Sequence, residues 1–210
     1  MVRRIAVVGC LVACLGVGHL ALAQEFSAEV FNSRMDSAQL KKVYAGKDKV
    51  RYEVESQNAA MGPSAVIVDE AENKWVVVMA ERHMYMDAPR SMTKPLITQF
   101  WHVQDVNDAC PQWKKTAEQA GTDTNWGRCT KIGDDSVNGR SAVKYEGLSK
   151  KGEKNHVWVD KKLHCVIKTE DGKGSMELRN IKEGAQPSSL FEVPAGYTKF
   201  DLGSMMNRSR

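Results

Sequence analysis

The sequence predicts an α+β domain in which a curved antiparallel sheet, shaped as a half-open barrel, holds two or three helices on its concave side. Three observations predict this fold. Apolar and polar residues alternate with period two along most of the chain, which is typical of half-buried antiparallel strands. Short polar turns join these runs, so neighbours in sequence are expected to pair. Two helical stretches interrupt the strands midway, which is typical of a sheet that wraps around helices.

The first 23 residues differ from the rest of the chain and predict an export signal. Arg3 and Arg4 precede an apolar stretch, and an Ala-Leu-Ala motif ends at Ala23, so cleavage is expected between Ala23 and Gln24. Two alternatives stay open: lipidation at Cys14, which follows a small residue, and retention of the segment as a membrane anchor. In each case the sequence predicts a periplasmic or envelope-associated protein.

The residues that follow the signal are expected to form one domain, because their number suits a single core. We place this domain at residues 24–204, with an insertion at about 105–131 and a flexible tail at 205–210. The chain has 30 Lys and Arg residues against 26 Asp and Glu residues. This near balance gives no reason to expect a nucleic-acid partner, and we expect a monomer.

Strand-like runs fill the first part of the domain. They lie at residues 26–30, 42–44, 50–54, 65–68 and 75–79, with a hairpin turn at 45–48. The last two runs are apolar on both faces, unlike the alternating runs before them. The sequence therefore predicts that other parts of the chain cover both faces of the sheet there.

The middle and the last part of the domain combine helices and further strands. Helices are expected at 93–101 and at 111–120, where Pro111 starts the second helix and Gly121 ends it. Further strands are expected at 129–132, 141–145, 156–159, 163–169 and 175–181, and one helical turn at 188–191. Turn residues at 137–140, 150–153 and 171–174 predict hairpins between successive strands.

Three cysteines remain after the signal, and export permits a disulfide between two of them. Cys110 and Cys129 lie in one polar segment that has little apolar surface of its own, so we expect them to be joined. Cys165 shares a strand face with Leu163 and Ile167, which predicts a buried free thiol.

Motifs for hydrolases, nucleotide binding and zinc proteases are absent from the sequence. We therefore expect no enzyme activity, no catalytic residue and no cofactor. The acidic pairs at 69–70 and 134–135 are interpreted as solvated turn charges.

One cluster of soft ligands gives a minor alternative function. His83, Met84 and Met86 supply an imidazole and two thioethers, which suit Cu(I), and the two methionines share one face of a strand. Methionine on an apolar strand is more often a filler of the core or of a pocket, so no metal site is predicted as the main function.

Several short sequence segments, in order along the mature chain, resemble one protein family. They are Phe26-Ser-Ala, residues 43–51, 67–69, 75–79, 85–86 and 157–160, and the C-terminal Leu190-Phe-Glu-Val-Pro-Ala-Gly-Tyr197. Together they resemble an exported bacterial family of unknown function within the superfamily of periplasmic lipoprotein-sorting carriers (LolA-like). The resemblance implies a half-open barrel lidded by helices around an apolar cavity, which receives acyl chains in the carriers. The segment from Cys110 to Cys129 looks like an insertion relative to the shorter pattern of that family.

A binding protein is the function that these observations favour. We expect an apolar ligand or a lipidated protein to bind in the hollow of the half-barrel, with peripheral membrane contact as a further expectation. The candidate cavity residues are apolar and lie on expected strands: Val66, Val68, Trp75, Val77, Met79, Met84, Met86 and Trp158. The alternative is a periplasmic protein-interaction module without a small ligand.

Overall fold

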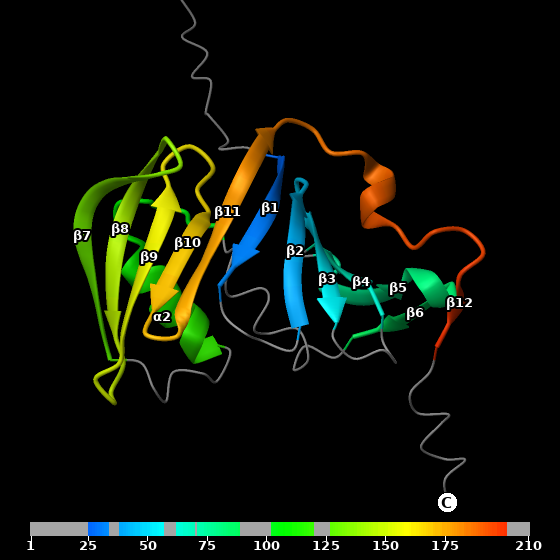
Figure 1. Cartoon of the computed structure of the whole chain (residues 1–210), viewed down its shortest axis with the longest axis horizontal. Helices are drawn as coiled ribbons and strands as arrows, with labels where there is room; N and C mark the ends of the chain where they lie inside the picture. The colour runs from blue at the N-terminus through cyan, green and yellow to red at the C-terminus, as the bar shows by residue number, and fades with distance from the viewer. Residues whose placement is uncertain are drawn as a thin grey trace, which may run out of the picture.

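The twelve strands of the computed structural model form one curved, open, mixed sheet (Figure 1). The structure describes residues 25–33, 38–56, 62–69, 71–88, 102–119 and 127–200. The expected signal at 1–23, the expected helix at 93–101 and the tail at 205–210 lie outside the described residues.

The strands follow the alternating segments of the sequence, and most are longer than expected. They are β1 (Phe26–Asn32), β2 (Ala38–Ala45), β3 (Lys49–Ser56), β4 (Ser64–Asp69), β5 (Lys74–Met79), β6 (Met84–Asp87), β7 (Arg128–Val137), β8 (Arg140–Leu148), β9 (Lys154–Asp160), β10 (Val166–Asp171), β11 (Gly174–Glu183) and β12 (Thr198–Lys199). Their order in the sheet is β12-β6-β5-β4-β3-β2-β1-β11-β10-β9-β8-β7.

Neighbours in sequence pair as antiparallel hairpins, as the turn residues predict. The prediction of a wholly antiparallel sheet is nevertheless wrong at one edge. Thr198 and Lys199 run parallel to β6, opposite Met84 and Tyr85. The chain reaches this edge through a long connection from β11 rather than through a hairpin, and a long connection permits parallel pairing.

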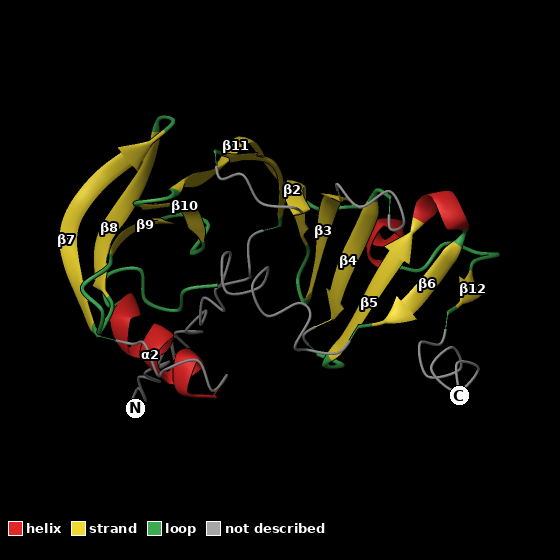
Figure 2. Ribbon diagram, turned by 60° about the horizontal axis from the view of Figure 1, so that its bottom comes forward, coloured by secondary structure: helices red, strands yellow, loops and turns green. Residues whose placement is uncertain are grey.

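The prediction of two or three helices on the concave side is wrong for the described residues, which contain one α-helix. This helix is α2 (Ala109–Gln119), which starts two residues before Pro111. Two short 3-10 helices complete the set: η1 (Ala80–Arg82) between β5 and β6, and η3 (Ser188–Phe191) at the expected helical turn. The sheet arches over α2 at the β7–β10 end (Figure 2).

The two faces of the sheet can be followed through the strand register. Directly paired residues share a face, and so do residues two apart on one strand. Starting from Val66, this rule gives one continuous row: Tyr52, Val43, Ala28, Val30, Leu178, Met176, Thr169, Val157 and Tyr145. We call this face the inner face, because Tyr145 and Val157 pack in the cluster that contains α2.

Different segments cover the two ends of the sheet. At the β8–β10 end, α2 and the residues before it pack on the inner face, in a buried cluster that includes Val103, Ala109, Val143 and Val159. At the β4–β6 end, residues 187–200 cross the outer face, where Phe191 packs with Ile67, Val76 and Val78. We call residues 187–200 the C-terminal segment. The largest buried cluster of the described residues includes Val43, Val66 and Val68 of the inner face. Both faces of β4 therefore contribute to the core.

Candidate functional site

Seven of the eight predicted cavity residues lie together on the inner face of β4–β6. Val66 pairs with Val77, and Val77 pairs with Met86. The rows on either side bring the remaining four onto the same face. They are Val68 opposite Trp75, and Met79 opposite Met84. We call these seven residues the inner patch.

The inner patch combines buried and partly exposed side chains. Val66, Val68, Met79 and Met86 are buried, whereas Trp75, Val77 and Met84 are partly exposed. The prediction that both faces are covered is confirmed for β4, whose residues from Ala65 to Asp69 are all buried. It is wrong for β5, because Trp75 and Val77 on its inner face are partly exposed. A methionine- and valine-rich surface of this kind is apolar and can adapt its shape, since the thioether chains are flexible.

Trp158, the eighth candidate, lies on the other face. Val157 and Val159 on each side of it both pack in the α2 cluster, so alternation directs Trp158 outward. Its indole Nε1 donates a hydrogen bond to Asp135 Oδ2 at 2.8 Å, and the Nζ atoms of Lys144 and Lys168 lie 4.7 and 4.5 Å from its ring centroid. The lysines cover the ring, which is 4% exposed.

The structure does not bring His83 together with the two methionines. His83 has a left-handed backbone (φ 50°) after η1, and its ring lies 5.3 Å from that of Tyr197 in the C-terminal segment. Tyr197 belongs to the outer-face cluster, whereas Met84 and Met86 lie on the inner face. The described residues contain no group of three His, Cys, Asp or Glu side chains placed to hold a metal ion.

The expected disulfide between Cys110 and Cys129 is present, with 5.7 Å between the two Cα atoms. It fastens the first turn of α2 to the start of β7. Nearby, Tyr145 Oη donates to Val106 O at 2.7 Å and accepts a hydrogen bond from Ala109 N at 3.2 Å. Cys165 is a buried free thiol, as predicted, and burial raises its pKa far above the ordinary value.

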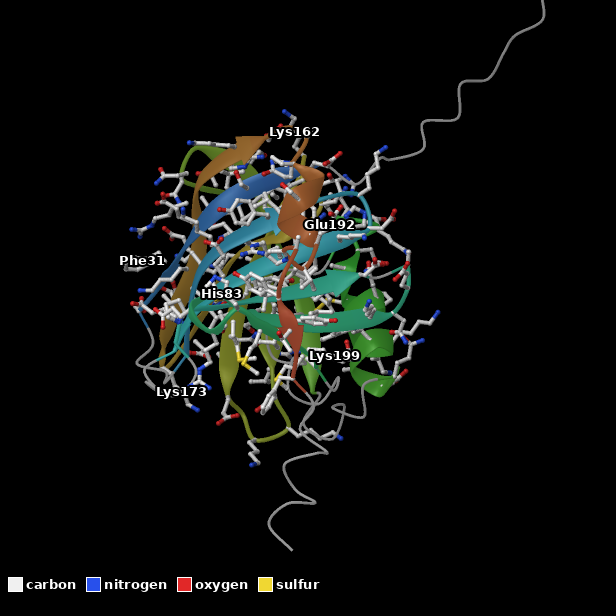
Figure 3. The ribbon with its side chains drawn as sticks, turned by 90° about the vertical axis from the view of Figure 1, so that its right-hand side faces the viewer. Phe31, His83, Lys162, Lys173, Glu192 and Lys199 are labelled. Carbon is white, nitrogen blue, oxygen red and sulfur yellow. A yellow bond between two sulfur atoms is a disulfide. The ribbon has the colours of Figure 1, made fainter. Side chains whose placement is uncertain are left out.

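A groove lies on the outer face, opposite the inner patch, and has a volume of about 350 Å³. We call it the outer groove. Its lining residues come from β3 to β6, the β4–β5 turn and the C-terminal segment: Lys49, Ile67, Asp69, Glu72, Lys74, Val76, Tyr85, Phe191, Glu192 and Val193. Figure 3 views this side of the molecule, with Glu192 just after η3.

Asp69 is the buried polar group of the outer groove, with 7% of its surface exposed. Its Oδ1 accepts a hydrogen bond from Glu72 N at 2.9 Å, and its Oδ2 lies 3.0 Å from Lys49 Nζ. These contacts hold the pKa of the carboxyl below its ordinary value, with the Glu72 amide as the main cause, while the carboxylate raises the pKa of Lys49.

Sequence reasoning missed the outer groove. The interpretation of Asp69 as a solvated turn charge is wrong, because the side chain folds back under its own turn and meets Lys49 on the neighbouring strand. Asp135 also departs from this interpretation, since it binds Trp158. The only feature of the sequence that could point to this groove is an acidic residue at the end of an apolar strand, followed by a turn. Many solvated acidic residues share this feature.

Comparisons with known proteins identify the fold through structure alone. No protein-family model matches the sequence, and no curated protein matches it. A solved structure of an uncharacterized conserved protein from Thermus thermophilus has a TM-score of 0.50 at 13% identity, over 85% of this chain and 91% of that chain. The chain shares the fold of that Thermus protein, and the likeness concerns the fold alone.

Two further solved structures have the same general resemblance at lower scores. A putative outer membrane lipoprotein-sorting protein domain from Vibrio parahaemolyticus has a TM-score of 0.31 at 11% identity, over 79% of this chain and 88% of that chain. The Pseudomonas aeruginosa MucA/MucB complex gives a TM-score of 0.44 at 14% identity, over 80% of this chain and 56% of that chain. Similarity at this level assigns no function.

Proposed function

We propose that this chain is an exported envelope protein that binds an apolar ligand, or the lipid part of a lipidated protein, on the inner face of its sheet. The inner patch is the observation that carries the proposal. Seven apolar side chains share one face of β4–β6, and Trp75, Val77 and Met84 stay partly exposed there. When a ligand covers apolar surface that was accessible to solvent, binding is favoured by about 25 cal/mol per Å² of surface removed from water.

The position of α2 supports the proposal. Its cluster joins residues of β7 to β10 and includes no residue of β2 to β6. Val66 and Val68 of the inner patch belong instead to the largest buried cluster, with Trp75 and Val77 packed against it. The partly exposed side chains of the patch therefore lie at the border of the core and outside the α2 cluster. A large apolar surface with few polar groups suits a ligand recognised by shape and hydrophobicity rather than by hydrogen bonds.

Export rests on the sequence of residues 1–23. Among the helices that the structure describes, none has the length and apolar character to cross a membrane. The Cys110–Cys129 disulfide agrees with an oxidising compartment, where such bonds persist.

The test begins with protein purified after export. Its lipid extract is analysed by mass spectrometry, and binding of the apolar dye N-phenyl-1-naphthylamine is followed by fluorescence. We expect copurified lipid and saturable dye binding. Protein that carries no lipid and does not bind the dye would contradict the proposal and favour the protein-interaction alternative.

Two neighbouring residues of β6 provide a matched pair of variants. Met84 and Tyr85 are both partly exposed but point to opposite faces. Met84→Ser is expected to weaken dye binding about five-fold, through loss of roughly 1 kcal/mol of apolar contact. Tyr85→Ser should leave the affinity unchanged. The reverse pattern would place the dye in the outer groove and contradict the proposal.

A further inference from the structure

The outer groove is separate from the site of the proposed function. Residues alternate between the two faces along each strand, so Ile67 and Val76 face the outer groove while Val66 and Val77 belong to the inner patch. The sheet itself lies between the two sites. A ligand in the outer groove would therefore be bound independently of one on the inner face.

Charged residues form a row across three strands at one end of the outer groove. Lys49 pairs with Asp69 in the register of β3 and β4, and Asp69 pairs with Lys74 in the register of β4 and β5. The ion pair between Lys49 and Asp69 neutralises the first two charges locally. The side-chain ammonium of Lys74 has no ion-pair or hydrogen-bond partner among the described residues, so it is available to a ligand.

Two carboxylates complete the rim of the outer groove. Glu72 comes from the β4–β5 turn and Glu192 from the C-terminal segment. Their negative charges raise the pKa of Lys49, so both carboxylates lie near the Lys49 end of the row. Neither forms an ion pair within 4.0 Å in the described part of the chain. Counting only partners in the described part of the chain, the rim thus offers one unpaired cation and two unpaired anions.

The floor of the outer groove is apolar. Ile67, Val76 and Phe191 are buried, and Tyr85 and Val193 are partly exposed beside them. The volume of about 350 Å³ lies at the small end of the range for ligand sites. This size suits a compact molecule.

We propose that the outer groove binds a small zwitterion with an apolar side chain, an amino acid or a dipeptide. The carboxylate of the ligand lies against Lys74, its ammonium lies against Glu72 or Glu192, and its side chain covers Tyr85 and Val193. Opposite charges beside an apolar floor match this chemistry, because a ligand with only one charge would leave part of the rim without a partner.

The test uses the full exported chain with its disulfide formed, labelled with ¹⁵N and titrated with L-phenylalanine. We expect progressive shifts of the backbone amide signals of Tyr85 and Val193. N-acetyl-L-phenylalanine lacks the ammonium and L-phenylalaninamide lacks the carboxylate. Each analogue should bind about three-fold more weakly, which is the effect of losing one exposed ion pair.

Substitutions of the rim residues test which residue binds each charged group of the ligand. Lys74→Ala is expected to weaken L-phenylalanine about three-fold and to leave L-phenylalaninamide unaffected, because the amide has no carboxylate to lose. The Glu72→Gln, Glu192→Gln double variant should weaken L-phenylalanine but not its N-acetyl form. Lys173→Ala, in the exposed β10–β11 turn, serves as the matched lysine control (Figure 3).

Three outcomes would overturn the inference. They are the absence of amide shifts at millimolar L-phenylalanine, binding of both blocked analogues as tight as that of L-phenylalanine, and shifts produced only by dihexanoylphosphatidylethanolamine. The last outcome would assign the same charges to a lipid headgroup. None of these outcomes depends on dye binding at the inner patch, so the inference and the proposed function fail separately.

Discussion

The two ends of the sheet are built from similar strands but are covered on opposite faces. At the β7–β10 end the cover is α2, which lies on the inner face and is cross-linked to β7 by the Cys110–Cys129 disulfide. At the β4–β6 end the cover is the C-terminal segment, which lies on the outer face. At β4 both faces are nevertheless buried, because Val66 and Val68 lie in the largest buried cluster. Strand alternation thus decides which residues share a face, while the covering segments differ between the two ends.

The covers are also attached differently. The disulfide and the two hydrogen bonds of Tyr145 hold α2. The C-terminal segment is held by the Phe191 ring, by a hydrogen bond from Arg51 to Leu190 O, and by the pairing of β12 with β6. The Phe191 ring packs directly on Gly46. A residue with a side chain at this position would place its Cβ atom 3.1 Å from the ring. One cover therefore depends on a covalent bond and the other on packing.

The largest effect is expected from removal of the Phe191 ring. Phe191→Ala should lower the free energy of unfolding by about 4 kcal/mol, because the outer cluster loses a buried ring and retains a cavity. Urea unfolding measures this change. Phe31→Ala is the control, since Phe31 is 43% exposed and its loss should cost below about 1 kcal/mol. Equal losses in the two variants would show that the C-terminal segment does not depend on its packing.

The next effect concerns the cover on the inner face. Replacement of Cys110 and Cys129 by Ser should cost about 3 kcal/mol of stability, mainly because the unfolded chain is no longer constrained. Hydrogen exchange should then quicken in β8 and β9, next to α2, more than in β4 and β5. A uniform change over the whole sheet would contradict the view that the two covers act locally.

A smaller effect separates the two ends by pH. Partial removal from water and the neighbouring His164 lower the pKa of His102, although the side chain is still exposed in part. The unfolded chain therefore binds a proton there more readily, and stability is lost as pH falls below about 6.5. Asp69 has a lowered pKa, so its contribution is complete above about pH 3.9 and is lost as pH falls through the folded value.

Amide exchange measured at successively lower pH tests this order. Mild acid should loosen residues 102–106 near α2 first, and β4 should loosen only at stronger acid. His102→Gln should remove the first step, and Asp69→Asn should remove the second. Loosening of both ends at one pH in the unmodified protein would contradict this prediction.

The sequence predicts the strands well because the apolar pattern is strong and the turns are marked. The positions of Val66, Val77 and Met86 on one face follow from alternation, and the structure agrees. The helical turn at 188–191 and the helix after Asp108 also appear. β7 continues to Val137, beyond the expected residue 132, because an edge strand tolerates the charges of Asp134 and Asp135.

Other features depend on contacts that no local pattern contains. Trp158 was expected inside, but residues 157–159 are apolar at every position, so periodicity does not tell which face meets α2. The parallel pairing of β12 involves two residues, which is too short for a pattern. The outer groove needs residues from four strands, a turn and the C-terminal segment, and so appears only once the chain has folded.

The place of β1 in the middle of the sheet has a consequence for folding. β2 to β6 can form through local hairpins, and so can β7 to β11, but only β1 joins the two sets. Its partner β11 lies about 150 residues further along the chain, as in the pairing of Phe31 with Glu177. Contacts at such separation form slowly, because a long loop must close first. A chain delivered N-terminus first must therefore keep β1 unpaired on one side until β11 arrives.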